Sequence, residues 1–350
     1  MKNVFKINLV ILLVCGLLLG SCTAPTPPDT PAPTAEEVHN WKLFISTSYD
    51  EWAARELRDT VLPAVHEASG ERLKIDPYIP NEHPYAKQDL LMVVRDRIAE
   101  MSYVSGGYLS GIEPHLAVLE LPMIMPPDVN LTYEIYWKVF DRVFRPTLDR
   151  WDAQEVLTPL WPHQHIAASV PITDWNALKG QRIRTWSKEL TDFVNMLNGI
   201  GVEVAFADVQ TKLANGDIDG AISHSGALYD LGVFEHVKYL NFLEIQVGLP
   251  WLVVSKKALG ELPADLRNIF LGTMRSYQDH MIQGALKDAN NKTLAAVKDF
   301  GVTITPLSGD FRREVEERVR TAVWEPWADR AGHQGKSALV AVEEAKATMK

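Results

Sequence analysis

Cysteine is almost absent from this chain of 350 residues, which contains only Cys15 and Cys22. Both lie near the N-terminus, so we expect no disulfide bridge in the folded part, and its stability must come from a buried core. The sequence has no zinc-binding spacing of cysteines, no P-loop and no glycine-rich dinucleotide motif. The formal net charge is −10, which disfavours nucleic acid as a partner. We therefore predict no cofactor and no nucleic-acid partner.

Long hydrophobic runs are also missing, apart from one short run near the N-terminus. Lys2 and Lys6 precede eleven largely apolar residues, 9–19, which are too few to span a bilayer and are typical of a secretory signal. The run ends in Leu-Gly-Ser-Cys22, which resembles the lipid-attachment box of bacterial lipoproteins. We expect residues 1–21 to be a lipoprotein signal peptide and Cys22 to carry a lipid. The alternative is a secretory peptide with an incidental cysteine.

A proline-rich segment follows the signal. Residues 22–38 contain five prolines and no apolar periodicity, which predicts an extended linker rather than a packed element. Together these segments place the protein in the periplasm or cell envelope, with a lipid holding it to the membrane. The remaining residues, 39–350, are numerous enough for two lobes.

Residues 175–224 read as alternating strands and helices. Residues 181–186 alternate as a strand does, Ser187 can cap a helix, and apolar residues recur at helical spacing over residues 190–197. Two further strands, 202–206 and 217–224, are separated by a short helix at 208–215. This order predicts a largely parallel sheet, whose ligands sit beyond the carboxyl ends of the strands. Arg184 falls at such an end, and Arg182 shares its strand face.

The first part of the folded region also alternates between strands and helices. We expect one strand to begin at Trp41 and two more to lie at residues 73–79 and 101–111. Helices are expected over residues 50–69 and 88–100. Residues 101–111 run into a glycine-rich loop beside Tyr103 and Ser105, which suits the wall of a pocket. A tight turn with tyrosines in the core explains the same pattern.

These segments together resemble the substrate-binding proteins of tripartite ATP-independent periplasmic (TRAP) transporters, of the dicarboxylate-binding type. The resemblance covers residues 41–327 and is most specific in four stretches, 102–122, 175–186, 213–224 and 252–263. It implies an α/β fold of two hinged lobes, like a type II periplasmic binding protein, with a long helix in residues 264–300 that spans both lobes. Lobe I would comprise residues 39–161 and about 248–287, where Trp251 lies in the expected strand by which the chain returns to this lobe (the return strand). Lobe II would comprise residues 162–247 and about 288–350.

The resemblance also assigns a ligand contact. In the family motif Leu-Lys-Gly-x-x-Ile-Arg, the arginine pairs with the carboxylate of the ligand, and Arg184 occupies that position. Guanidinium suits this role because its planar fork donates two parallel hydrogen bonds to one carboxylate. Taken without the motif, Arg184 would be read as a solvated residue at a strand end.

Part of the family pattern is missing. Many members have Asp-Gly-Gln-Glu-Asn-Pro where this chain has Asp219 to His224, so Ser223 is the polar residue left near the ligand. This departure disfavours a four-carbon dicarboxylate and favours a bulkier monocarboxylate. Residues 160–168 would place Trp161, His163 and His165 on one strand face, with Trp161 and His163 toward the ligand. For each histidine, a structural role explains the sequence as well.

Three aromatic residues are further candidates for the pocket. Tyr49 lies at the start of the first expected helix, where members of this family often contact the ligand, although the helix core is an equal alternative. Trp186 and Tyr229 follow strands that lead toward the expected cleft. No cluster of carboxylates argues for a bound cation.

The expected function is therefore capture of an organic carboxylate between the two lobes. The resemblance implies delivery of the ligand to two membrane subunits, a small four-helix protein and a large multi-span protein, with no chemistry on the ligand. One alternative is a lipoprotein sensor that presents a ligand to a receptor. The other is a metal-dependent hydrolase that uses His163, His165 and Asp174, since the two histidines have zinc-ligand spacing on a strand.

Overall fold

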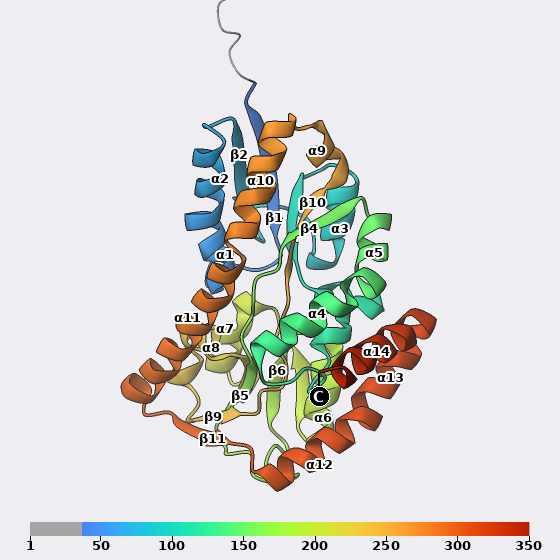
Figure 1. Cartoon of the computed structure of the whole chain (residues 1–350). Coiled ribbons are helices and arrows are strands. Elements are labelled where there is room, and N and C mark those ends of the chain that lie inside the picture. Colours follow the sequence, from blue (N-terminus) through green and yellow to red (C-terminus); the bar gives the residue numbers. More distant parts are fainter. Residues whose placement is uncertain (1–36, 350) are drawn as a thin grey trace, which may run out of the picture. The chain divides into compact units, whose positions relative to one another are not determined.

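The computed structural model describes residues 37–349, which fold around two β-sheets (Figure 1). The expected signal peptide, Cys22 and nearly all of the proline-rich linker lie outside the described residues. Within residues 37–349, no helix combines the length and the apolar character needed to cross a membrane.

The first sheet has the strand order β2-β1-β3-β10-β4. Strand β1 pairs in parallel with β2 and β3, whereas β10 runs antiparallel to both β3 and β4. The strands are β1 (His39–Ile45), β2 (Leu73–Tyr78), β3 (Met101–Val104), β4 (Ala153–Leu157) and β10 (Trp251–Ser255). The predicted return strand is therefore inserted between two strands that lie about 50 residues apart in sequence.

The second sheet has the strand order β11-β9-β5-β8-β6-β7. Strand β6 pairs in parallel with β7 and β8, and β5 pairs antiparallel with β8 and β9. The strands are β5 (Gln164–Ala168), β6 (Arg182–Thr185), β7 (Ile200–Glu203), β8 (Gly220–His224), β9 (Tyr239–Phe242) and β11 (Thr303–Pro306). The predicted parallel core is present, but β7 covers residues 200–203 rather than the expected 202–206, and residues 206–208 form a 3₁₀ turn.

Helices surround the first sheet and form the first lobe with it. They are α1 (Trp52–Glu56), α2 (Leu62–Ala68), α3 (Leu90–Arg95), α4 (Val129–Val143), α5 (Arg145–Arg150), α9 (Lys256–Glu261) and α10 (Ala264–Ser276). A single π-helical turn, Leu57–Val61, joins α1 to α2, so the predicted helix over residues 50–69 is nearly continuous. Trp41 of β1 packs edge-on against Phe270 of α10 with ring centroids 5.3 Å apart, which ties sheet and helix together.

Further helices accompany the second sheet and form the second lobe with it. They are α6 (Lys188–Met196), α7 (Val209–Ala214), α8 (Ser225–Asp230), α11 (Gln278–Phe300), α12 (Gly309–Val319) and α13 (Glu325–Arg330). The predicted cap of α6 is confirmed, because the Ser187 hydroxyl oxygen accepts the Leu190 N–H at 3.3 Å. Leu190, Phe193 and Val194 then face the core and are fully buried.

A long helical segment connects the two lobes, as expected. It consists of α10 and α11, which break at Tyr277. Helix α10 packs on α2, whereas α11 contacts both α1 of the first lobe and α8 of the second (Figure 1). The two-lobed α/β fold is therefore present.

The C-terminal helix α14 (Gly332–Ala347) packs against α4 of the first lobe. Arg142 of α4 pairs with Glu344 at 2.6 Å, and Lys138 donates to the Thr348 hydroxyl at 3.0 Å. The predicted lobe boundaries placed this segment with lobe II. Its contacts show that the end of the chain returns to helices of the first half.

Candidate functional site

A cavity of about 310 Å³ lies where side chains of the two lobes meet. The first lobe and the connection after β4 contribute Thr47, Glu51, Tyr108 and Trp161, and the second lobe contributes Gln164, Arg184, Trp186, Phe206, Ser223 and His224. A second cavity of about 900 Å³ shares Thr47, Tyr108, Arg184, Trp186 and Phe206 with the first. Four of the predicted ligand contacts, Arg184, Trp161, Trp186 and Ser223, thus come together.

Arg184 is the only arginine that lines either of these two cavities within residues 37–349. It is 2% exposed, its Nε donates to the Val204 carbonyl oxygen at 3.1 Å, and its Nη1 donates to the Ile222 carbonyl oxygen at 2.9 Å. Burial lowers its pKa to about 10, which still leaves it protonated at neutral pH. No carboxylate of the described residues forms an ion pair with it, so a buried positive charge faces the cavity without a protein counter-ion.

Arg182 has a different environment. Its side chain pairs with Asp219 at 2.8 Å and is 40% exposed. Arg182 is therefore paired with Asp219 at the surface. Of the two arginines, only Arg184 reaches the cavity.

Aromatic rings form the walls of the cavity. Tyr108 contacts both Trp161 and Trp186, with ring centroids 5.8 Å and 5.5 Å apart. Trp161 and Trp186 meet edge to face at 6.1 Å, and the Phe206 ring lies 5.9 Å from the Arg184 guanidinium. These rings offer flat apolar surfaces to the body of a ligand while its charged end meets Arg184.

Tyr103 and Ser105 support the walls rather than line the cavity. The Tyr103 hydroxyl accepts the Trp161 Nε1–H at 2.9 Å, which fixes the orientation of the indole. The Ser105 hydroxyl donates to Glu120 Oε1 at 2.7 Å. Gly107, which donates its N–H to the same carboxylate at 3.0 Å, has no room for a Cβ because the Trp186 ring and Glu120 lie against it.

Tyr49 and Tyr229 have other contacts. The Tyr49 hydroxyl donates to the Pro77 carbonyl oxygen at 3.4 Å, and the Arg58 guanidinium lies over its ring at 4.1 Å. The Tyr229 hydroxyl donates to Asp299 at 3.1 Å. Neither residue lines the cavity.

The predicted common face of Trp161, His163 and His165 is wrong. Pro162 lies between Trp161 and His163, and the strand β5 begins only at Gln164. His163 does not line the cavity, and burial lowers its pKa. The His165 ring stacks on Phe242 with centroids 3.8 Å apart, and its Nδ1 accepts the Glu244 N–H at 3.3 Å.

Four polar residues of the cavity, Thr47, Glu51, Gln164 and His224, were missed by the sequence reasoning. Gln164 and His224 lie directly opposite each other across β5 and β8, and Glu51 caps α1 by accepting the N–H groups of Ala53 and Ala54 at 2.9 Å. Burial raises the pKa of Glu51 to about 7. Strand alternation would have identified Gln164 as a candidate for the cavity if the expected strand had been taken to begin after Pro162.

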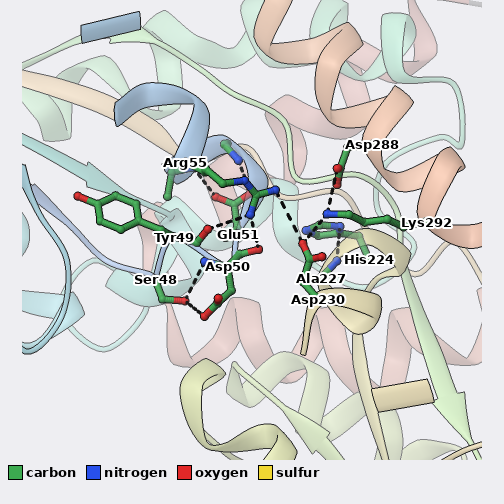
Figure 2. Close-up of polar contacts among 12 residues, drawn as sticks. Ser48, Tyr49, Asp50, Glu51, Arg55, His224, Ala227, Asp230, Asp288 and Lys292 are labelled. Atoms are coloured by element: carbon green, nitrogen blue, oxygen red, sulfur yellow. Dashed lines mark hydrogen bonds and ion pairs between the residues drawn. The ribbon is translucent and has the colours of Figure 1, made fainter. Parts of the chain in front are cut away.

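An ionic network joins the lobes beside these residues (Figure 2). Arg55 of α1 lies 3.9 Å from Asp230 of α8, and Lys292 of α11 contacts Asp230 at 2.5 Å and Asp288 at 3.0 Å. Glu51 caps α1 and His224 caps α8, and both capping residues line the cavity. The network therefore connects two helices whose capping residues line the cavity.

Among residues 37–349, no group of three His, Cys, Asp or Glu side chains has an arrangement that could hold a metal ion. His163, His165 and Asp174 thus do not form the site that a metal-dependent hydrolase would need.

The sequence and the structure are both similar to known proteins. The model for the bacterial extracellular solute-binding proteins of family 7 matches residues 61–329. The C4-dicarboxylate-binding periplasmic protein of Rhodobacter capsulatus is 27% identical over 178 residues, which are 50% of this chain and 53% of that protein. The match thus spans about half the length of this curated relative.

Solved structures of low sequence identity share the fold. A solute receptor of Bordetella pertussis that binds pyroglutamic acid has a TM-score of 0.78 at 18% identity, covering 87% of this chain and 100% of the receptor. A TRAP periplasmic solute-binding protein of Desulfovibrio salexigens with bound orotic acid also has a TM-score of 0.78 at 18% identity, covering 89% and 99%.

Proposed function

Since the chain belongs to family 7 of the bacterial extracellular solute-binding proteins, we propose that it captures an organic carboxylate for a TRAP-type importer. The ligand would bind in the cavity between the lobes, with its carboxylate on Arg184 and its body between Trp161 and Trp186. Tyr108, Phe206 and Ser223 would complete the contacts. The protein would perform no chemistry on the ligand.

One observation carries this proposal: Arg184 is buried in the cavity and has no carboxylate partner among residues 37–349. A buried charge is costly unless it is paired. A carboxylate ligand therefore gains more binding free energy from the buried Arg184 than it would from an arginine at the surface. A charged hydrogen bond in such a setting contributes about 1.5 to 3 kcal/mol. The ligands of the Bordetella and Desulfovibrio proteins, pyroglutamic acid and orotic acid, are small ring compounds with one carboxylate, which agrees with a single arginine in the cavity.

The test is calorimetry of the purified protein with pyroglutamate, orotate, succinate and a neutral sugar. We expect at least one carboxylate to bind, and Arg184→Ala to weaken that binding by at least about tenfold. Arg182→Ala is the matched control, because that arginine pairs with Asp219 outside the cavity. Equal binding by Arg184→Ala, or binding of the sugar alone, would refute the proposal.

Delivery to partners is part of the same proposal. The small four-helix and large multi-span subunits would accept the ligand from the closed protein, and a lipid on Cys22 would hold the protein at the membrane. Co-purification of the protein with these subunits tests the first point. For the second, incorporation of labelled palmitate should be lost in Cys22→Ala; if the label persists, the anchor lies elsewhere.

A further inference from the structure

Two buried side chains in the cavity have polar atoms without a partner among the described residues. Gln164 is 2% exposed and His224 is 4% exposed, and both line the cavity that holds Arg184. Their unpaired atoms are Gln164 Oε1 and His224 Nε2. The two residues are direct cross-strand neighbours of β5 and β8, so their side chains stand on one face of the sheet, a few ångströms apart.

The hydrogen bond at the other ring nitrogen fixes what His224 offers. Its Nδ1 accepts the Ala227 N–H at 3.3 Å as the cap of α8 (Figure 2). Nδ1 therefore carries no proton, and the proton of the neutral ring is on Nε2. Burial, helped by the positive charge of Lys292, lowers the pKa of His224 to about 3, so the ring stays neutral. His224 presents a neutral N–H donor.

Gln164 offers the complementary group. Its Nε2 donates to the Pro162 carbonyl oxygen at 3.3 Å, which leaves the side-chain oxygen as a free acceptor. One donor and one acceptor thus stand side by side. A buried polar atom that stays unpaired costs about 1 to 3 kcal/mol, so a ligand that satisfies both atoms is favoured over one that satisfies neither.

We propose that Gln164 and His224 form a subsite that recognises a neutral group with adjacent acceptor and donor atoms, such as a cyclic amide, on the carboxylate ligand. This inference rests on the proposed function, since Arg184 is taken to hold the carboxylate. The ligand class is then a small monocarboxylate with an amide-like group, whose oxygen accepts from His224 and whose N–H donates to Gln164.

A second carboxylate fits this subsite poorly. It has no proton to donate to Gln164 Oε1 and would face that oxygen with a negative charge. Glu51 lines the same cavity and would add repulsion when it is ionised. Lys87 lines the second cavity, which shares Arg184 with this one, but not this cavity itself.

Three probes of similar size separate the possibilities. Pyroglutamate has a carboxylate and a ring amide, cyclopentanecarboxylate has the same five-membered ring without the amide, and succinate has two carboxylates. In calorimetry with the full chain, we expect pyroglutamate to bind about 100-fold more tightly than cyclopentanecarboxylate, about tenfold for each added hydrogen bond. Succinate should bind more weakly than pyroglutamate.

Two variants test the residues. His224→Asn keeps a side-chain oxygen that can cap α8 but lacks the Nε2 donor, and Gln164→Met keeps the length of the side chain without its acceptor. Each should weaken pyroglutamate binding by about tenfold and leave cyclopentanecarboxylate nearly unchanged. Melting temperatures without ligand show whether either variant has lost its fold.

The outcomes separate the two proposals. If carboxylates bind through Arg184 but the parent does not prefer pyroglutamate, or both variants keep that preference, the subsite is refuted and the proposed function stands. Succinate binding as tightly as pyroglutamate also refutes it. If no probe binds in an Arg184-dependent way, both proposals fail.

Discussion

At the scale of single residues, buried ionisable groups gather around the ligand cavity. Arg184, Glu51 and His224 line it, and Glu120 lies behind the Gly107 loop. Burial shifts each pKa toward the neutral form, down for Arg184 and His224 and up for Glu51 and Glu120. Only Arg184 keeps its charge firmly at neutral pH. Arg184 is therefore the one firm positive charge among these four groups, in line with the proposal of a single carboxylate on the ligand.

Glu120 should make stability depend on pH. Burial raises its pKa to about 7, above the value near 4.5 expected for the unfolded chain. The folded state then holds the proton more tightly, so its stabilising contribution is full below pH 4.5 and is lost as the pH rises through about 7. Relative to Glu120→Gln, we expect the parent to lose on the order of 2 kcal/mol of unfolding free energy between pH 5 and pH 8.

Urea unfolding of both proteins at the two pH values measures this difference. The Gln variant keeps the size of the side chain but cannot ionise, so other titrating groups cancel in the comparison. A constant difference between the two proteins would show that Glu120 has the same pKa when folded and unfolded.

At this scale, the predictions from the sequence depended on the family motif that contains Arg184. Strand alternation placed Arg182 and Arg184 on one face, and only the motif position favoured Arg184, which lines the cavity together with Trp161, Trp186 and Ser223. The support of Trp161 by Tyr103 could not be predicted, because it joins residues 58 positions apart. The pair of Gln164 and His224 depends on the register of two strands, which the pattern of either strand alone does not determine.

At the scale of elements, the junction of α8 with α11 brings three partly buried charges of the network together. Lys292 lies between Asp230 and Asp288, and the three side chains are 16% to 21% exposed. Lys292→Met should therefore leave two carboxylates close together without a cation. We expect a loss of about 2 kcal/mol of unfolding free energy, between the values for exposed and fully buried pairs.

Chemical denaturation of Lys292→Met measures this loss. Adding Asp230→Asn to the same protein should recover part of it, because one of the two uncompensated charges is then removed. If the double variant is no more stable than the single one, the cost of the substitution is lost packing rather than charge.

Element types were predicted well where apolar periodicity was strong, and element ends were predicted less well. Helix α6 begins at its capping serine as expected, whereas α3 covers only residues 90–95 of the predicted 88–100. Residues 87–89 form a 3₁₀ turn instead, and Arg97 adopts a positive φ of 59° soon after the helix ends. Such local changes follow from tertiary packing and leave the hydrophobic pattern intact.

At the scale of the whole molecule, Arg55 and Asp230 link the two lobes near the cavity. Their side chains are 33% and 21% exposed, so the pair is partly screened by water. If the ligand-bound state brings the lobes together, this contact favours that state. Arg55→Gln should weaken ligand binding by about threefold to fivefold and increase the radius of gyration of the ligand-free protein.

Calorimetry and small-angle scattering measure the two effects. Arg58→Gln is the control, because that arginine pairs with Asp59 of its own helical segment at 2.6 Å and does not reach the second lobe. Identical behaviour of the two variants would show that the contact between Arg55 and Asp230 has no part in closure.

The division into two lobes could be predicted from chain length and from the return strand. The path of the C-terminus could not be predicted, because α14 packs on α4, which lies about 200 residues earlier in the sequence. The apolar pattern of α14 does not indicate which helix it packs against. The lobe boundaries remain a prediction, which limited proteolysis of the ligand-free protein would test.

The place of β10 in the first sheet also sets the order in which the protein can fold during synthesis. Strands β3 and β4 both pair with β10, yet β10 ends at Ser255. Until the ribosome has made that residue, β3 and β4 each present an unpaired edge, and nothing joins them. The first half of the chain therefore cannot finish its sheet alone. A nascent chain shorter than about 255 residues must therefore leave this sheet incomplete, with strand edges that favour aggregation.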